Sequence, residues 1–265
     1  MTRVLLCCCC VVFALWGCSS SDELATAGAA ERFAAARALF MDEDYLEAVN
    51  QFTVLTLQFQ GTAYADSSQF FLAEARYRRE EFLLAAFEYQ QLRRNMPSSP
   101  LVADAQFMTA ECYRRLAPPS PLDQQYTLKA IDEFQTFLEY HPAHPRAAEA
   151  EAAIRELTDR MAGKTYEIAQ QYRALRYYRA AQFYLEDVME KYHDTGYAPL
   201  ASLERAEVLV ARRKPAEARA AVGSFLERFP HSVLRSRAEK LLLEIQAEMD
   251  RHPPVPSPPG GTERP

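Results

Sequence analysis

Residues 85–97 have the sequence AAFEYQQLRRNMP, and this stretch holds the three features that decide the fold. Ala85 is followed four places later by a large aromatic residue, Tyr89, and twelve places later by Pro97. Residues four apart lie on one face of a helix, so the alanine lets a neighbouring helix approach closely while the ring fills the space beside it. Because proline cannot continue a helix, we expect this helix to end before residue 97.

The same arrangement recurs along the chain. One column of small residues is followed by large apolar residues four places on; the pairs are Ala48 and Phe52, Ala85 and Tyr89, Ala130 and Phe134, Ala181 and Leu185, and Ala218 and Val222. A second small column stands twelve residues before four of these alanines, at Ala36, Ala73, Ala169 and Ala206, while Ala110 precedes Ala130 by twenty because APPSPLDQ (117–124) lengthens that turn. The steps from Ala36 to Ala73, from Ala73 to Ala110 and from Ala169 to Ala206 are each 37. This period is typical of stacked helix pairs. We predict an all-α fold, a right-handed α-solenoid of about five helix pairs plus a C-terminal helix.

Together the period, the two columns and the closing prolines resemble tetratricopeptide (TPR) repeats. The resemblance covers residues 29–250, although Gln60 and His193 stand where two prolines are expected and the early Trp of the repeat is absent. We expect repeats 1–3 in residues 29–143. Repeats 4–5 and a capping helix are expected in residues 144–250.

The two ends of the chain differ from the repeats. Residues 1–17 place Arg3 before a short apolar run, which is the layout of a secretory signal; its four consecutive cysteines would otherwise suggest metal binding or palmitoylation. Leu15 to Cys18 resemble a bacterial lipobox, so we expect Cys18 to be lipidated and residues 18–28 to form a flexible tether. Processing leaves Cys112 as the remaining thiol. Residues 251–265 are Pro-rich, and we expect a disordered tail.

Residue patterns that carry chemistry are weak or incomplete. AGKT (162–165) imitates the end of a phosphate-binding loop, but Thr158 stands where the earlier glycine is required. HPAH (141–144) spans a proline-broken turn without a nearby Cys ligand. The net charge of −6 lacks the basic excess that nucleic-acid binding needs. We therefore expect no enzyme activity, no cofactor, no metal site and no nucleic-acid partner.

One column indicates binding. Phe33, Phe70, Phe107, Tyr166 and Leu203 each stand three residues before the second small column, at one equivalent place on successive first helices. If that place faces the concave groove of the repeats, it presents an aromatic strip to an extended peptide, with Arg37, Tyr77 and Arg114 one turn further on. The alternative is that the column packs between repeats as core.

Charge divides along the chain. Residues 18–162 carry 13 basic and 22 acidic side chains, whereas residues 163–240 carry 14 basic and 10 acidic ones. Two ends of opposite sign predict two different partners, because complementary potentials steer association. The basic end could meet an acidic protein domain or anionic head groups. The alternative is unselected variation in solvated charge.

The export signal, the lipobox and the five repeats together resemble the BamD family of outer-membrane β-barrel assembly lipoproteins. PPSPLDQQY (118–126), the long helical run from about 146 to 172 and YYRAAQFYLEDVMEKYHDT (177–195) are similar to that family's third and fourth repeats. The resemblance implies a scaffold anchored by lipid on the periplasmic face of the outer membrane. Its N-terminal repeats would bind unfolded β-barrel precursors, and its C-terminal repeats would bind the barrel-forming BamA subunit in a complex with other assembly subunits. The alternative is a periplasmic TPR adaptor for cell-wall synthesis or envelope constriction.

Overall fold

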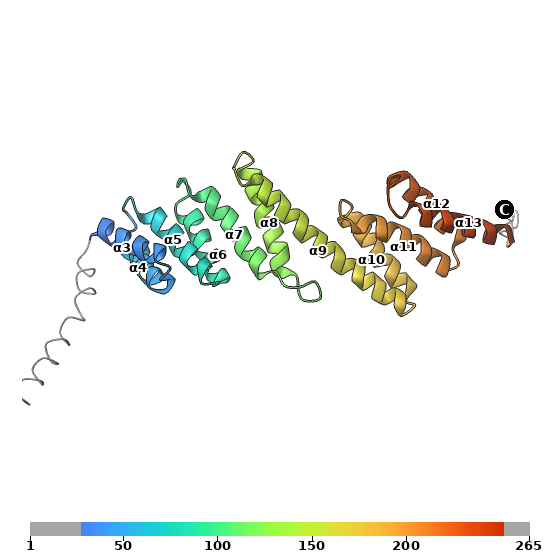
Figure 1. The fold of residues 1–265 in the computed structure, drawn as a ribbon, viewed down its shortest axis with the longest axis horizontal. Helices are drawn as coiled ribbons and strands as arrows, with labels where there is room; N and C mark the ends of the chain where they lie inside the picture. The colour runs from blue at the N-terminus through green and yellow to red at the C-terminus, as the bar shows by residue number, and fades with distance from the viewer. Residues whose placement is uncertain (1–27, 252–265) are drawn as a thin grey trace, which may run out of the picture. The chain divides into compact units, whose positions relative to one another are not determined.

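The structure is a computed structural model that describes residues 28–251, and every regular element in that range is an α-helix (Figure 1). The helices, in chain order, are α3 (Ala29–Met41), α4 (Tyr45–Gln58), α5 (Ala65–Arg78), α6 (Phe82–Asn95), α7 (Val102–Leu116), α8 (Gln125–Tyr140), α9 (Ala147–Ala174), α10 (Tyr178–Lys191), α11 (Tyr197–Ala211), α12 (Pro215–Arg228) and α13 (Arg235–Arg251). The predicted all-α fold of TPR-like helix pairs is confirmed.

The paired columns form the core, as the pattern predicts. The ten alanines of the two columns, together with Phe52, Tyr89, Phe134, Leu185 and Val222, are each at most 1% exposed. Burying a side chain as large as Phe52 stabilises the fold by roughly 1.5–3 kcal/mol, and the facing alanines let the helices approach closely enough to do so.

Four turns within helix pairs share one backbone conformation. Glu43, Glu80, Arg176 and Arg213 have positive φ values between 59° and 63°, the left-handed region that ends many helices. Each residue lies between the first and second helix of a repeat. One left-handed residue there lets the chain turn back within a connection of a few residues. The third pair lacks such a residue among its described turn positions because residues 117–124 form a longer connection.

The chain divides into two compact units. Unit 1 comprises residues 28–117 and 125–153 of the described chain, and in it α3 to α8 pack in sequence, each against the next. Phe52, Leu55 and Leu72 lie in one of its core clusters, with the half-buried rings of Phe33, Phe40 and Phe71 packed against them.

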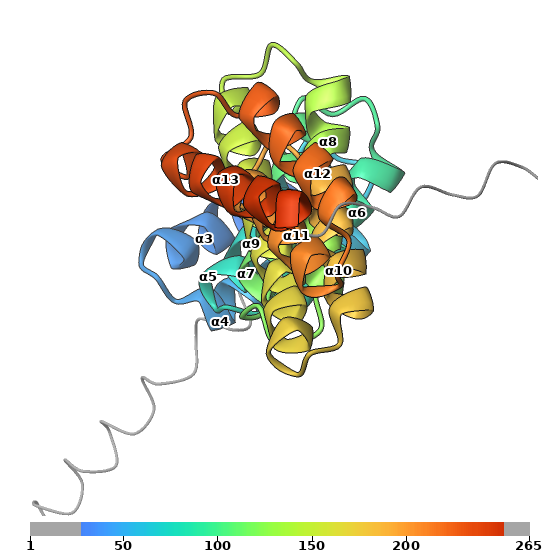
Figure 2. The ribbon, with the colours of Figure 1, turned by 90° about the vertical axis from the view of Figure 1, so that its right-hand side faces the viewer.

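Unit 2 comprises residues 118–124 and 154–251 of the described chain. Tyr166, Ala169 and Tyr172 of α9 pack with Leu185 of α10 and Val208 of α11 in one cluster. The capping helix α13 contacts α11 and α12, beside which it lies in Figure 2. The long connection joins this unit because Lys164 Nζ donates to the Leu122 carbonyl oxygen at 2.6 Å.

The division falls between Ala153 and Ile154, inside α9. The reason is that α9 continues for 28 residues without a proline. Its first residues pack with unit 1 and its later residues with unit 2. The predicted signal peptide, the predicted tether after Cys18 and the Pro-rich tail lie outside the described residues, apart from Gly28 and Arg251. None of the described helices is both long enough and apolar enough to cross a membrane.

Candidate peptide-binding groove

Unit 1 carries a polar pocket of about 380 Å³ between α5, α7 and the start of α9, here called the groove pocket. Its lining residues are Glu74, Tyr77, Arg78, Met108, Glu111, Arg146 and Glu149. On α5, positions 77 and 78 lie three and four residues after position 74, about one helical turn on, and therefore share a face with it. Glu111 on α7 is the equivalent of Glu74 one repeat later, 37 residues on.

Glu111 joins two of the predicted groove residues. The Tyr77 hydroxyl donates to Glu111 Oε1 at 3.3 Å, and Arg114 donates from Nε and Nη2 to the two carboxylate oxygens at 2.7 and 2.9 Å. Burial, followed by the nearby charge of Glu111, raises the pKa of Tyr77 above its usual value. The phenol therefore stays protonated and acts as a hydrogen-bond donor at physiological pH.

Arg146 forms one wall of the groove pocket. Its guanidinium carbon lies 3.4 Å from the centroid of the Phe107 ring, and its Nε and Nη2 donate to the Glu149 carboxylate at 2.9 and 3.0 Å. A guanidinium stacked on a ring and held by a carboxylate has little freedom to rotate. Arg146 is therefore a fixed part of the pocket wall.

Arg78 is the lining cation that is left available. Its side chain is exposed and makes no ion pair with any residue in the part of the chain that the structure describes. Glu74, by contrast, accepts a short hydrogen bond from the Tyr89 hydroxyl, and Glu149 is paired with Arg146. The groove pocket thus offers one unpaired guanidinium, that of Arg78, to a carboxylate ligand.

The predicted aromatic column does not form one strip. Phe107 is 0% exposed and its ring packs against Phe134 and Phe137, while Leu203 is 1% exposed. For these two positions the prediction of a groove-facing side chain is wrong, because the small column lets the next helix close over them. Phe33 and Phe70 are half-buried; Phe33 packs against Phe52, and Phe70 packs against Tyr89.

The other predicted site residues lie in separate surroundings. Arg37 is exposed, with its guanidinium carbon 5.3 Å from the Phe71 ring centroid, and does not line the groove pocket. Tyr166 belongs to unit 2, where its hydroxyl donates to Glu204 at 2.7 Å; burial and this hydrogen bond raise the pKa of Tyr166. The structure therefore brings Tyr77 and Arg114 together and leaves Arg37 and Tyr166 elsewhere.

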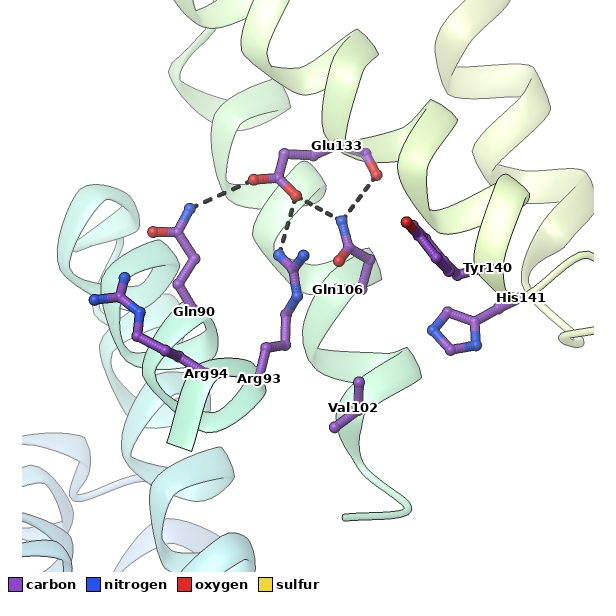
Figure 3. Close-up of a pocket in the computed structure, with 8 residues that line it drawn as sticks. All are labelled: Gln90, Arg93, Arg94, Val102, Gln106, Glu133, Tyr140 and His141. Carbon is purple, nitrogen blue, oxygen red and sulfur yellow. Dashed lines mark hydrogen bonds and ion pairs between the residues drawn. The ribbon is translucent and has the colours of Figure 1, made fainter. Parts of the chain in front are cut away.

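A second pocket of unit 1, of about 520 Å³, lies between α6, α7 and α8 (Figure 3). Its centre is Glu133, which accepts from Arg93 at 3.0 Å, from Gln106 at 2.5 Å and from Gln90 at 3.4 Å. Figure 3 shows these donors converging on one carboxylate from two other helices. With its carboxylate occupied in this way, Glu133 ties the three helices together.

The described residues contain no group of three His, Cys, Asp or Glu side chains that could hold a metal ion. Cys112 is fully buried, and burial raises the pKa of its thiol, which opposes formation of the reactive thiolate. Gly163 and Thr165 of AGKT lie inside α9, where the segment is helical and not a phosphate-binding loop.

Sequence reasoning missed Glu111, Arg78 and Arg146. The signal for Glu111 was present, because Glu74 and Glu111 both follow an alanine of the second small column at the 37-residue period. Arg146 takes the place that Tyr64 and Leu101 take in the earlier turns between repeats, so periodicity gave no signal for a cation there. It reaches Phe107 only in the folded unit.

Comparison with known proteins gives a family and several TPR structures. TTC0263, a thermophilic TPR protein of Thermus thermophilus, is 16% identical over 82% of this chain and 100% of its own, with a TM-score of 0.35. The TPR2AB domain of yeast Sti1, in its complex with pHSP90, is 12% identical over 82% of this chain and 98% of its own, with a TM-score of 0.37. No curated protein matches the chain. The sequence pattern of YfiO, described as outer membrane lipoprotein, matches residues 26–210, and the chain belongs to this family.

Proposed function

We propose that this lipoprotein is a non-enzymatic scaffold for the assembly of outer-membrane β-barrels. In this proposal unit 1 binds unfolded barrel precursors, unit 2 binds the periplasmic part of the barrel-forming subunit, and lipid on Cys18 holds the chain at the periplasmic face of the membrane. The family supports the membrane location, and the TPR-like helix pairs are a type of fold that binds other polypeptides. Residues 163–240, which lie within unit 2, carry an excess of basic side chains, and this supports a separate partner for that segment.

The observation that carries the proposal is the unpaired Arg78 beside Tyr77 in the groove pocket. The Arg78 guanidinium can bind a peptide carboxylate, and Met108 offers an apolar contact for the side chain next to it. We therefore expect the pocket to take the C-terminal end of an extended precursor, with the terminal carboxylate on Arg78.

The decisive experiment measures binding of a synthetic peptide with an aromatic C-terminal residue to the full chain. Arg78→Ala should weaken binding of the free-acid peptide about tenfold, because one charge-assisted hydrogen bond is worth about 1.5–3 kcal/mol. The matched control is Arg79→Ala. Arg79 is the next residue along the chain and carries the same charge, but its Nε is already paired with Glu81 Oε1 at 2.8 Å. An amidated peptide should bind both variants and the unaltered chain with similar, weaker affinity.

Equal losses in Arg78→Ala and Arg79→Ala, or an amidated peptide that binds as tightly as the free acid, would refute the carboxylate site. Circular dichroism of both variants shows whether either change disturbs the helices.

Two further measurements test the rest of the proposal. Affinity capture of the full chain from detergent-solubilised envelopes should recover the barrel-forming subunit; recovery of peptidoglycan synthases or Tol proteins in its place would favour the cell-wall adaptor. Intact-mass analysis of the native protein should show a chain that begins at Cys18 and carries acyl groups. The mass of the unmodified chain would remove the lipid anchor.

A further inference from the structure

Unit 2 carries an open pocket whose lining is almost entirely tyrosine and basic residues, here called the tyrosine–arginine pocket. Its volume is about 630 Å³, and it is lined by Tyr172, Arg176, Tyr177, Tyr178, Arg179, Ala180, Arg212 and Lys214. It shares no residue with the groove pocket of unit 1. The proposed scaffold function assigns no specific contact to these residues.

Two equivalent turns build this pocket. Arg176 lies in the turn between α9 and α10, and Arg213 lies 37 residues later in the turn between α11 and α12, both with left-handed φ values of 61° and 59°. Because neighbouring repeats place equivalent turns at the same end of the stack, residues 176–180 come together with Arg212 and Lys214. The short left-handed turns hold these cations on well-defined backbone.

The charges in the pocket are unbalanced. Four of the eight lining residues are cationic and none is a carboxylate. Lys214 pairs with Glu217 at 2.7 Å, and Arg212 donates a short hydrogen bond to Gln182. Arg176 and Arg179 are both exposed, and neither forms an ion pair within residues 28–251. Cations gathered in this way repel one another unless an anion lies between them.

The tyrosines give the pocket an apolar wall with polar edges. Tyr172 stacks on Tyr184 with ring centroids 5.4 Å apart and contacts Tyr177 edge-on at 6.4 Å. Tyr177 is 62% exposed although its ring is large and apolar. Such rings can pack against the carbon skeleton of a ligand while their hydroxyls donate hydrogen bonds to its oxygens.

We propose that the tyrosine–arginine pocket binds a phosphate-bearing ligand. The Arg176 and Arg179 guanidiniums would donate to the phosphate oxygens, Arg212 and Lys214 would add charge, and Tyr177 would pack against the rest of the ligand. A phosphate group concentrates its charge in one small group, whereas an acidic peptide spreads single charges along its backbone. Several cations in one pocket therefore suit phosphate better, and the planar guanidinium matches its oxygens in two parallel hydrogen bonds.

Isothermal titration of the full chain with inorganic pyrophosphate tests the site directly. The double variant Arg176→Ala/Arg179→Ala should bind pyrophosphate at least about tenfold more weakly, since charge-assisted hydrogen bonds are lost from both residues. The matched control, Arg219→Ala/Lys240→Ala, removes two positive charges from exposed positions of the same unit that do not line the pocket. It should change the affinity by less than about twofold.

Two further ligands identify the source of the phosphate. Dihexanoyl phosphatidylglycerol, used as a dissolved monomer, should bind more tightly than pyrophosphate if the natural ligand is a lipid head group. If it binds more weakly, a soluble phosphate compound is the ligand. Both results support a phosphate site provided that the double variant binds pyrophosphate and the lipid more weakly than the unaltered chain does. Dihexanoyl phosphatidylcholine has the same chains and a phosphate but no net charge, and it should bind more weakly than the phosphatidylglycerol because the pocket is cationic.

Either of two results would overturn the proposal. One is equal loss of pyrophosphate affinity in the double variant and in the control, which would mean that only the overall charge matters. The other is that a glutamate-rich peptide binds in a manner that depends on Arg176 and Arg179 while pyrophosphate does not bind. That result would make the pocket a docking site for an acidic polypeptide.

Discussion

Gly163 of α9 lies directly beneath the phenol of Tyr197 at the start of α11. A side-chain carbon at position 163 would be 2.9 Å from the Tyr197 hydroxyl oxygen and 3.1 Å from the ring carbon that carries it. Tyr197 is also in contact with Tyr166, with ring centroids 5.6 Å apart. The glycine that resembles part of a phosphate loop in the sequence therefore allows two helices of unit 2 to approach closely.

This contact predicts opposite effects for two alanine substitutions in helices. Gly163→Ala should lower the free energy of unfolding by about 1–2 kcal/mol, because the displaced Tyr197 ring outweighs the gain in helix propensity. Gly223→Ala in α12, where a new side-chain carbon meets nothing within 4 Å, should raise it by about 0.5–1 kcal/mol. Urea unfolding followed by circular dichroism measures both; stabilisation by Gly163→Ala would contradict the close contact.

Phe107 should behave as a core residue. Phe107→Ala should lower the free energy of unfolding by about 3–5 kcal/mol, the usual cost of removing a fully buried ring. Phe87→Ala, at a ring that is 51% exposed in the same unit, should change it by less than about 0.5 kcal/mol. If Phe107→Ala instead weakened peptide binding and left the urea midpoint unchanged, the residue would belong to the groove after all.

The Cys112 thiol should be protected in the folded chain. Because burial raises its pKa and the residue is 0% exposed, iodoacetamide should not modify Cys112 under native conditions at mildly alkaline pH and should do so in urea. Peptide mapping by mass spectrometry identifies the modified site. An Ala143→Cys variant, with its thiol in an exposed turn, provides the control and should be modified in both conditions.

The stability of unit 1 should fall in mild acid because of His141. Burial, followed by the charges of His144 and Arg93, lowers the pKa of His141 below its usual 6.5, so the folded chain binds this proton less readily than the unfolded chain does. Stability is therefore retained above about pH 6.5 and declines as the pH falls through that value, where the unfolded state takes up the proton first.

The variant His141→Gln should make this decline shallower between about pH 7.5 and 5.5, as followed by thermal unfolding. His231→Gln, in the exposed turn before α13, serves as the comparison and should leave the slope unchanged. A slope that is the same in His141→Gln and in the unaltered chain would show that other groups cause the acid sensitivity.

The sequence by itself determined the helix pairs and their core. The spacing of Ala85, Tyr89 and Pro97 fixes a small residue, a large residue and a helix end, and all three act through local geometry that the order of residues specifies. The same reasoning placed Ala48 and Phe52 in the core, where both are 0% exposed. Periodicity also placed Tyr77 and Arg114 at equivalent positions, which proved to meet at one carboxylate.

Only the tertiary structure decided which side of each helix remained open. Phe33 and Phe107 occupy the same place in the repeat, yet Phe107 is fully buried beneath Arg146 whereas Phe33 is half-buried. Their difference depends on which side chain packs over each ring. The turn before α5 places Tyr64 against Phe33, with ring centroids 5.1 Å apart, whereas the equivalent turn before α9 places Arg146 over Phe107. A helical pattern shows which residues share a face, but the exposure of that face depends on contacts between residues far apart in the chain.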